Sequence, residues 1–210
     1  MLGDLWSFQG RYRTLHLTWI AFFLTFVVWF NLAPLATTVK ADLGLTVGQI
    51  RTVAICNVAL TIPARVLIGM LLDKFGPRIT YSSILVFSAI PCLLFASAQD
   101  FNQLVVARLL LSIVGAGFVI GIRMVAEWFP PKEIGLAEGI YGGWGNFGSA
   151  FSALTMVALA GFLSFSGGFE LPTGAVLNWR GAIALTGIVS AVYGLFYFFN
   201  VTDTPPGKTY

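Results

Sequence analysis

Residues 69–78 read Gly-Met-Leu-Leu-Asp-Lys-Phe-Gly-Pro-Arg and join two long apolar runs, 52–72 and 79–98. Gly76 and Pro77 favour a tight turn between the runs, because glycine tolerates unusual backbone angles and proline interrupts a helix. Three charged residues stand where the runs end: Asp73, Lys74 and Arg78. The stretch predicts two helices joined by a charged turn at a membrane surface, although such charges also suit an ordinary cytoplasmic loop.

The rest of the chain has the same apolar character. Of its 210 residues, 57% are hydrophobic and 10% are charged, and the mean hydropathy is +0.85. Soluble domains carry about 25% charged residues, so this composition excludes a soluble globular domain, a disordered chain and a collagen. The net charge of +3 is too small and too scattered for a nucleic-acid-binding patch. We therefore predict an integral membrane protein.

Six apolar runs are each long enough to cross a bilayer, which takes a helix of about 20 residues. These runs are 17–39, 52–72, 79–98, 104–126, 139–165 and 181–201. The prediction is an all-α integral membrane fold with six transmembrane helices. A cytoplasmic tail (1–15) would precede the bundle (16–202), and a polar segment with Pro and Gly (203–210) would begin a cytoplasmic linker. This organisation suggests half of a larger transporter.

The distribution of basic residues predicts the orientation. Six helices place both termini on one side of the membrane, and loops on the cytoplasmic side are enriched in Lys and Arg. With both termini in the cytoplasm, seven basic residues lie inside and four outside. The inside group is Arg11, Arg13, Lys74, Arg78, Arg123, Lys132 and Lys208, and the outside group is Lys40, Arg51, Arg108 and Arg180. We predict a multi-pass protein of the cell membrane with both termini cytoplasmic.

Arg65 lies deep within the second run. A charge at such a depth costs about 3 kcal/mol on insertion scales, so it indicates function by default. Asn57, Thr61, Arg65 and Gly69 follow one another at four-residue steps and form one polar stripe on a helix. No acidic residue stands at the same depth, so we expect the guanidinium to lie in a cavity inside the bundle. Its partner would be an anionic substrate, an acid in the missing half or backbone carbonyls.

The start of the fifth run is rich in glycine. Gly139, Gly142, Gly143, Gly145 and Gly148 fall within ten residues. Gly139 with Gly143, and Gly117 with Gly121 in the fourth run, are spaced for close helix packing, which is the ordinary explanation for most of these glycines. Asn146 differs, because its amide needs a partner within the membrane, which would be substrate, water or a facing helix.

Four segments resemble known families. The G-x-x-x-D-K-x-G-x-R spacing of residues 69–78 resembles the loop between helices two and three of the major facilitator superfamily, which builds twelve helices as two six-helix halves. Residues 135–148 resemble the helix-five signature of its nitrate/nitrite porter family. Residues 128–132 and 64–69 resemble the helix-four exit and helix two of the same family. The resemblance implies that the chain forms the N-terminal half of a major-facilitator fold.

The resemblance also implies a substrate and a site. Arg65 would grip nitrate or nitrite, Phe118 would press on the face of the anion, and Asn146 would border the site with flanking glycines. These glycines are Gly142, Gly143 and Gly145. The cytoplasmic gate and its surroundings would comprise Gly69, Asp73, Lys74, Gly76, Arg78, Arg123 and Glu127. The family's second substrate-binding arginine would belong to the missing C-terminal six-helix half, and Trp29, Phe30 and Asn31 are not assigned to the site.

The expected mechanism is alternating access, in which two halves rock about an anion site at the midplane, in nitrate assimilation. Two alternatives remain open: a transporter of another small anion or organic acid, and a non-transporting membrane subunit. The sequence shows no spacing typical of a catalytic triad or a metal site, and Cys56 and Cys92 both lie in apolar runs. We expect no enzyme activity and no cofactor. The expected partners are a small inorganic anion and the lipid bilayer.

Overall fold

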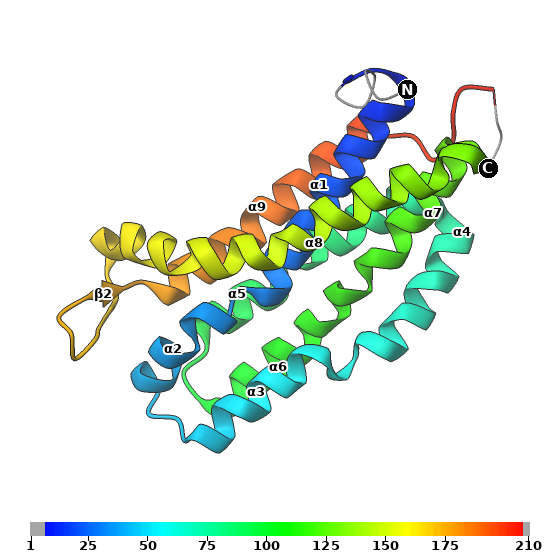
Figure 1. The fold of residues 1–210 in the computed structure, drawn as a ribbon. Coiled ribbons are helices and arrows are strands. Elements are labelled where there is room, and N and C mark those ends of the chain that lie inside the picture. Colours follow the sequence, from blue (N-terminus) through cyan, green and yellow to red (C-terminus); the bar gives the residue numbers. More distant parts are fainter. Residues whose placement is uncertain (1–6, 208–210) are drawn as a thin grey trace.

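The computed structural model describes residues 7–207, which form a helical bundle with one short β-ribbon. The helices run along one long axis, and the first and last segments that the structure describes lie at the same end of the bundle (Figure 1). We call this the Gly76 end. At the opposite end, the Asp42 end, lie α2 (Ala36–Asp42) and the ribbon of β1 (Phe169–Glu170) and β2 (Val176–Leu177). The strands pair antiparallel, with Phe169 opposite Leu177.

The remaining elements follow the predicted runs, with breaks. In chain order they are α1 (Gly10–Phe30), η2 (Ala33–Leu35), α3 (Val47–Ala59), α4 (Thr61–Phe87), α5 (Ala89–Ser97), α6 (Phe101–Ser112), η3 (Ile113–Gly117), α7 (Phe118–Trp128), α8 (Pro131–Phe162), η4 (Leu163–Ser166) and α9 (Trp179–Asn200). Several helices begin earlier than predicted, most clearly α1 at Gly10 and α8 at Pro131. The polar and charged residues before these two apolar runs therefore belong to the helices, which extend beyond the charge-free part.

Several of the predicted spans are interrupted near their middle. A 3₁₀ segment with Pro34 at its start follows α1, and η3 separates α6 from α7. The break between α3 and α4 at Leu60 comes three residues before Pro63, which cannot donate a backbone hydrogen bond. Short 3₁₀ segments inside longer helices often mark hinges, so these breaks give the bundle places to bend.

Gly76 interrupts α4 with non-helical backbone angles, φ 78° and ψ 166°. Ile68 and Leu71 before this point line a groove together with Ile84 and Phe87 after it, so the two limbs of α4 fold back on each other. Among residues 7–207, five stretches are long and apolar enough to cross a membrane, and one of them, Val47–Ser97, runs through this break over 51 residues. The structure therefore confirms an all-helical fold with several candidate membrane spans.

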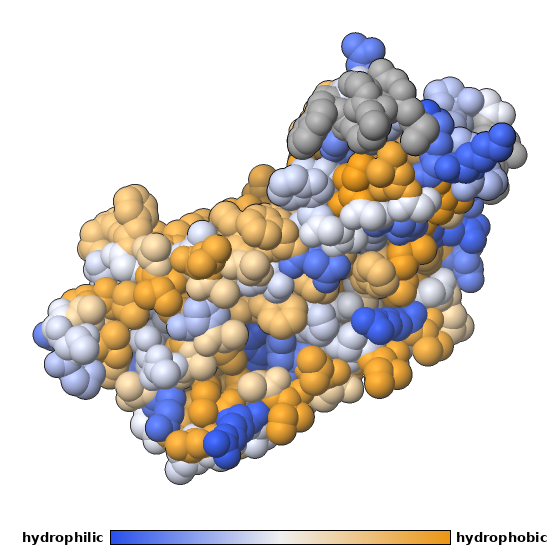
Figure 2. All heavy atoms as spheres, viewed as in Figure 1, coloured by the Kyte–Doolittle hydropathy of each residue, from blue (hydrophilic) through white to orange (hydrophobic). Residues whose placement is uncertain are grey.

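The interior contains two hydrophobic clusters, one toward each end. The cluster of the Gly76 end is rich in buried aromatic residues, including Phe22, Tyr81, Tyr141 and Tyr197. The cluster of the Asp42 end includes Phe95 and Trp179. Outside, large apolar side chains stay exposed along α4, α8 and α9, as expected for a surface that meets lipid or another apolar partner. Figure 2 shows hydrophobic residues over much of one face.

The glycines of α8 have two different roles in packing. A Cβ at Gly145 would overlap the ring of Phe22, and one at Gly148 would overlap the carbonyl of Phe23, so α1 and α8 touch closely at these points. At Gly121 a Cβ would overlap Tyr141. Nothing lies within 4 Å of the Cβ position at Gly139 or at Gly143. The predicted role in close helix packing is confirmed for the glycines of the fourth run, where Gly121 contacts Tyr141. Within the described chain this prediction is wrong for Gly139 and Gly143, which have no close neighbours.

Candidate functional site

Arg65 lies on the outer surface of α4. Its side chain is exposed, and among residues 7–207 it forms no ion pair. The expectation that its guanidinium lies enclosed within this bundle is therefore wrong. The two preceding members of its stripe are the ones held inside: Asn57 hydrogen-bonds the backbone of Trp29, and Thr61 donates to the carbonyl of Ser112 at 3.0 Å.

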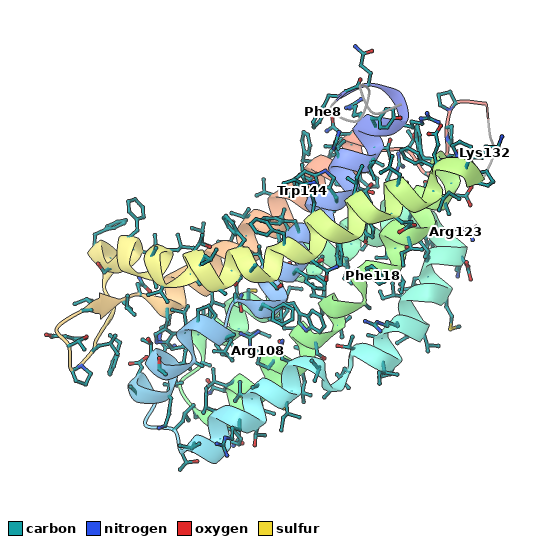
Figure 3. All side chains as sticks on the ribbon, in the orientation of Figure 1. Phe8, Arg108, Phe118, Arg123, Lys132 and Trp144 are labelled. Atoms are coloured by element: carbon teal, nitrogen blue, oxygen red, sulfur yellow. The ribbon has the colours of Figure 1, made fainter. Side chains whose placement is uncertain are left out.

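The Thr61–Ser112 hydrogen bond fixes the depth of Arg65. The first limb of α4 and the α6–η3–α7 segment run in the same direction. An α-helix rises about 1.5 Å per residue and a 3₁₀ helix about 2.0 Å, so Arg65 lies about level with Gly115 of η3. Phe118 lies about 6 Å further along the axis on the same rises. Figure 3 shows Phe118 about halfway along the bundle, so Arg65 and Phe118 lie about one helical turn apart near its middle.

Phe118 begins α7 in a cluster of three rings. It is half-buried, with its ring centroid 5.3 Å from that of Phe22 and 6.1 Å from that of Tyr141, to which it is stacked. The Tyr141 hydroxyl donates to the Phe118 carbonyl at 3.0 Å and lies 3.2 Å from the hydroxyl of Tyr81. These contacts join α1, α4, α7 and α8, and they give Phe118 a fixed position.

Asn146 and the glycines around it differ in exposure. Gly145 is buried against Phe22, and Gly142 is half-buried, while Asn146 and Gly143 are exposed. The Asn146 amide nitrogen donates to the carbonyl of Gly142 at 2.7 Å, within its own helix. The structure thus brings Gly145 and Phe118 together through Phe22, whereas the side-chain amide of Asn146 bonds within its own helix.

The residues predicted for the gate gather at the Gly76 end. Asp73 and Lys74 are exposed, and nothing lies within 4 Å of the Cβ position at Gly69. Arg78 is half-buried and its guanidinium carbon lies 4.7 Å from the ring centroid of Phe198. These side chains therefore occupy one end of the bundle, as the sequence predicted for the turn.

The predicted pairing of Arg123 with Glu127 is confirmed. The Arg123 Nε and the Glu127 Oε1 lie 3.1 Å apart, one helical turn along α7. In Figure 3 Arg123 lies closer to the Gly76 end than Phe118 does. A second ion pair at this end, between Arg11 and Glu133 at 2.8 Å, joins α1 to α8. The first of these ion pairs thus lies within one helix, and the second links two helices.

The buried arginine of the described bundle is Arg108, which sequence reasoning placed outside the membrane core. Its side chain is fully buried and donates to Asn31 Oδ1 at 2.8 Å and to Asn57 Oδ1 at 3.1 Å. Its guanidinium carbon lies 4.5 Å from the ring centroid of Phe95, and its Nε has no hydrogen-bond partner. The signal available in the sequence was an arginine inside an apolar run with Asn31 and Asn57 in two neighbouring runs.

The described residues contain no group of three or more His, Cys, Asp or Glu side chains placed to hold a metal ion. The arrangement that does occur consists of an exposed guanidinium, a fixed aromatic ring and a glycine-rich helix near one depth. Such an arrangement can contact a flat anion if another surface closes over it, because a guanidinium offers two parallel donors to an oxyanion.

The fold matches that of solved membrane transporters. A bacterial homologue of the human lysosomal transporter Spinster, in an inward-facing and occupied conformation, has a TM-score of 0.76 at 20% identity over 94% of this chain and 46% of that chain. Its inward-facing and unoccupied form has a TM-score of 0.74 at 21% identity over 94% of this chain and 44% of that chain. At this identity the likeness shows the fold.

The sequence profile of the Major Facilitator Superfamily matches residues 18–209. The chain belongs to this superfamily. It is 63% identical to the nitrate/nitrite transporter NrtP of Picosynechococcus, over 100% of this chain and 42% of that protein, and 61% identical to NrtP of Nostoc punctiforme, over 100% and 41%. It is 31% identical to a probable nitrate/nitrite antiporter, NarK1, of Thermus thermophilus, over 94% and 44%. The chain thus spans less than half the length of these relatives.

Proposed function

We propose that this chain forms the N-terminal half of a transporter that moves nitrate, nitrite or both across the cell membrane by alternating access, in nitrate assimilation. The observation that carries the proposal is the identity of 61–63%, along the whole chain, to two proteins named as nitrate/nitrite transporters. The second half would correspond to the part of those relatives that this chain does not cover.

The proposed half has six spans. At 1.5 Å per residue, the 51 residues of Val47–Ser97 would extend about 76 Å, more than twice the ~30 Å hydrocarbon thickness. The break at Gly76 divides this stretch into two crossings, which brings the number of spans from five to six. Both termini then lie on one side, and the excess of Lys and Arg at that side favours the cytoplasm. The Gly76 end is therefore the proposed cytoplasmic end.

In this proposal Arg65, Phe118 and Asn146 line one anion site between this half and the missing half. The exposed Arg65 guanidinium would grip the anion, because no carboxylate of the described chain pairs with it. Phe118 would press on the face of the anion, held by its contacts with Phe22 and Tyr141. Gly142, Gly143 and Asn146 would border the site, and the missing half would supply the opposite wall and a second arginine.

In the proposed cycle the two halves rock about this site and expose it to one side at a time. The gate on the cytoplasmic side would comprise Asp73, Lys74, Arg78, Arg123 and Glu127. Binding an anion offsets the guanidinium charge, which lowers the free energy needed to bring the halves together around Arg65. Exchange of nitrate for nitrite is the favoured mode.

The test is counterflow of nitrate and nitrite in proteoliposomes that contain the full-length transporter. Wild type should exchange the two anions, and Arg65→Lys should lose most of the exchange while keeping its melting temperature, because an ammonium cannot replace a bidentate fork. Arg51→Lys, which changes an exposed arginine of α3, is the matched control and should exchange normally. Normal exchange by the Arg65→Lys variant would contradict the site. Transport of an organic acid in place of both anions would contradict the substrate.

A further inference from the structure

Asp203 follows α9 and lies against the turn that separates the two limbs of α4. Its Oδ1 accepts a hydrogen bond from the backbone N–H of Arg78 at 2.7 Å, across 125 positions of sequence. A Cβ at Gly76 would lie 2.7 Å from the same oxygen. The carboxylate therefore fits directly against the backbone of the turn, with no room for a side chain at position 76.

The turn cannot cap its own helix. A helix start is usually capped by the side chain of the residue just before it, which accepts a hydrogen bond from one of the first free N–H groups. Here that residue is Gly76, and its φ of 78° strongly favours glycine, so it has no side chain to serve as a cap. Pro77 has no N–H, and Arg78 is the first residue that can donate. Asp203 supplies the missing cap from a distant part of the chain.

The segment that carries Asp203 is fixed at three successive residues, Val201, Thr202 and Asp203, which we call the anchor segment. The Val201 side chain is 2% exposed. The Thr202 carbonyl accepts from the indole N–H of Trp128 at 3.2 Å, at the end of α7. Asp203 then holds the turn in α4. The anchor segment thus joins the ends of α7 and α9 to the turn that begins the second limb of α4.

We propose that Asp203 is a positioning residue of the gate, which holds the Gly76 turn and its charged side chains in place through the backbone of Arg78. The expected effect of Asp203 on the exchange rate rests on the proposed transport function. Its effect on the position of the Gly76 turn does not depend on that function. Thr204 separates the anchor segment from Pro205, Pro206 and Gly207. The first residues after α9 therefore move as one body with the turn. The part of the chain that bends when the two halves move relative to each other then starts after Asp203.

Three variants of the full-length protein test this role: Asp203→Ala, which removes the cap, Asp203→Asn, which keeps an acceptor oxygen, and Asp100→Ala. Asp100 caps α6 at the opposite end, where its Oδ1 accepts from the Gln103 N–H at 3.0 Å, so it is the matched control. Each variant carries Lys74→Cys as the only cysteine, and its alkylation rate in lipid without nitrate reports how freely the turn opens.

Asp203→Ala should raise the alkylation rate about fivefold, as expected for loss of a helix cap, whereas Asp203→Asn and Asp100→Ala should stay within about twofold of the parent. Exchange is assayed separately in variants that keep Lys74 and the native cysteines. There, Asp203→Ala should lower kcat several-fold with little change in KM, because the anion site lies elsewhere. Equal alkylation in Asp203→Ala and the parent, equal effects of Asp203→Ala and Asp100→Ala, or a change confined to KM would each overturn the proposal. If the wild-type transporter moves neither anion but the alkylation pattern holds, the role of Asp203 stands and the nitrate assignment fails.

Discussion

The Arg108 guanidinium donates from Nη2 to the side-chain oxygen of Asn31 at 2.8 Å, inside the Asp42 end of the bundle. Asn31 in turn donates from Nδ2 to Thr186 at 2.9 Å, and Arg108 also reaches Asn57. One fully buried cation therefore ties α6 to the C-cap of α1, to α3 and, through Thr186, to α9. Neutral amide oxygens stabilise this charge, since the described residues provide no carboxylate within ion-pair distance.

We predict that Arg108→Ala destabilises the full-length protein by about 3 kcal/mol or more, because two buried amide oxygens lose a charged donor and a cavity forms. The apparent melting temperature in detergent measures this loss. Arg108→Lys should recover part of it, since an ammonium can satisfy one of the two oxygens but lacks the planar fork. Arg51→Ala, at an exposed position of α3, is the control and should stay within about 0.5 kcal/mol of wild type. A small loss in Arg108→Ala would show that the cluster is not structural.

Packing between α1 and α8 gives a second prediction. Gly145→Ala places a methyl group where the ring of Phe22 lies, and Phe22 is fixed by contacts with Phe118 and Tyr141. We expect a loss of about 1–3 kcal/mol in folding free energy, the range for overpacked cores. Gly139→Ala lies on the same helix with open space around it, so its methyl group should not disturb the packing of α1 against α8.

The two variants also differ in a second measurement. Because Phe22 contacts Phe118, Gly145→Ala should raise the KM for nitrate along with lowering the melting temperature, whereas Gly139→Ala should leave the packing of α1 against α8 intact. Equal melting temperatures for Gly145→Ala and wild type would mean that Phe22 can move aside without loss, contrary to the fixed ring cluster described above.

The helices and the turn were predictable from local sequence because apolar runs and glycine–proline pairs act over a few residues. Long apolar runs identified the helical segments, and the residues around Gly76 predicted the turn between them. The breaks at η2 and η3 were harder to predict from the sequence, because 3₁₀ geometry depends on tertiary packing as well as on Pro34 or the local glycines. The early start of α1 at Gly10 shows that helices continue through charged residues that the hydropathy pattern excludes.

The exposure of individual side chains was much harder to predict. Arg65 and Arg108 both lie in apolar runs, and only Arg108 faces polar partners inside the bundle, including Asn31 at a distance of 77 positions in sequence. Which face of a helix turns inward depends on its neighbours, and their order is not encoded in any local pattern. The hydrogen bond from the Arg78 N–H to Asp203 could not be predicted from the sequence for the same reason. The nitrate assignment came from motif resemblance, because an arginine by itself fits many anions.

The last prediction concerns the Asp42 end, where the Arg180 guanidinium contacts two backbone carbonyls and one carboxylate. Its Nη1 donates to the carbonyls of Ala96 at 2.8 Å and Ala98 at 2.6 Å, and its Nη2 lies 3.4 Å from Asp42 Oδ2. Asp42 also accepts from the indole N–H of Trp179 at 2.8 Å. Together these contacts join α2, the end of α5 and the start of α9, and Arg180 lies at their centre.

Arg180→Ala should therefore lower the folding free energy by about 1–3 kcal/mol, because two carbonyls and a carboxylate lose their shared donor at a site where the arginine side chain is 30% exposed. Arg180→Lys should recover only part of this, since one ammonium cannot span acceptors on two segments. Lys40→Ala, at the end of α2, is the control for loss of a positive charge at the same end. Melting temperatures in detergent would measure all three. If raising the salt concentration from low to 1 M removed the difference between Arg180→Ala and wild type, the contribution would come from screened charge attraction, and the bonds to the two carbonyls would count for little.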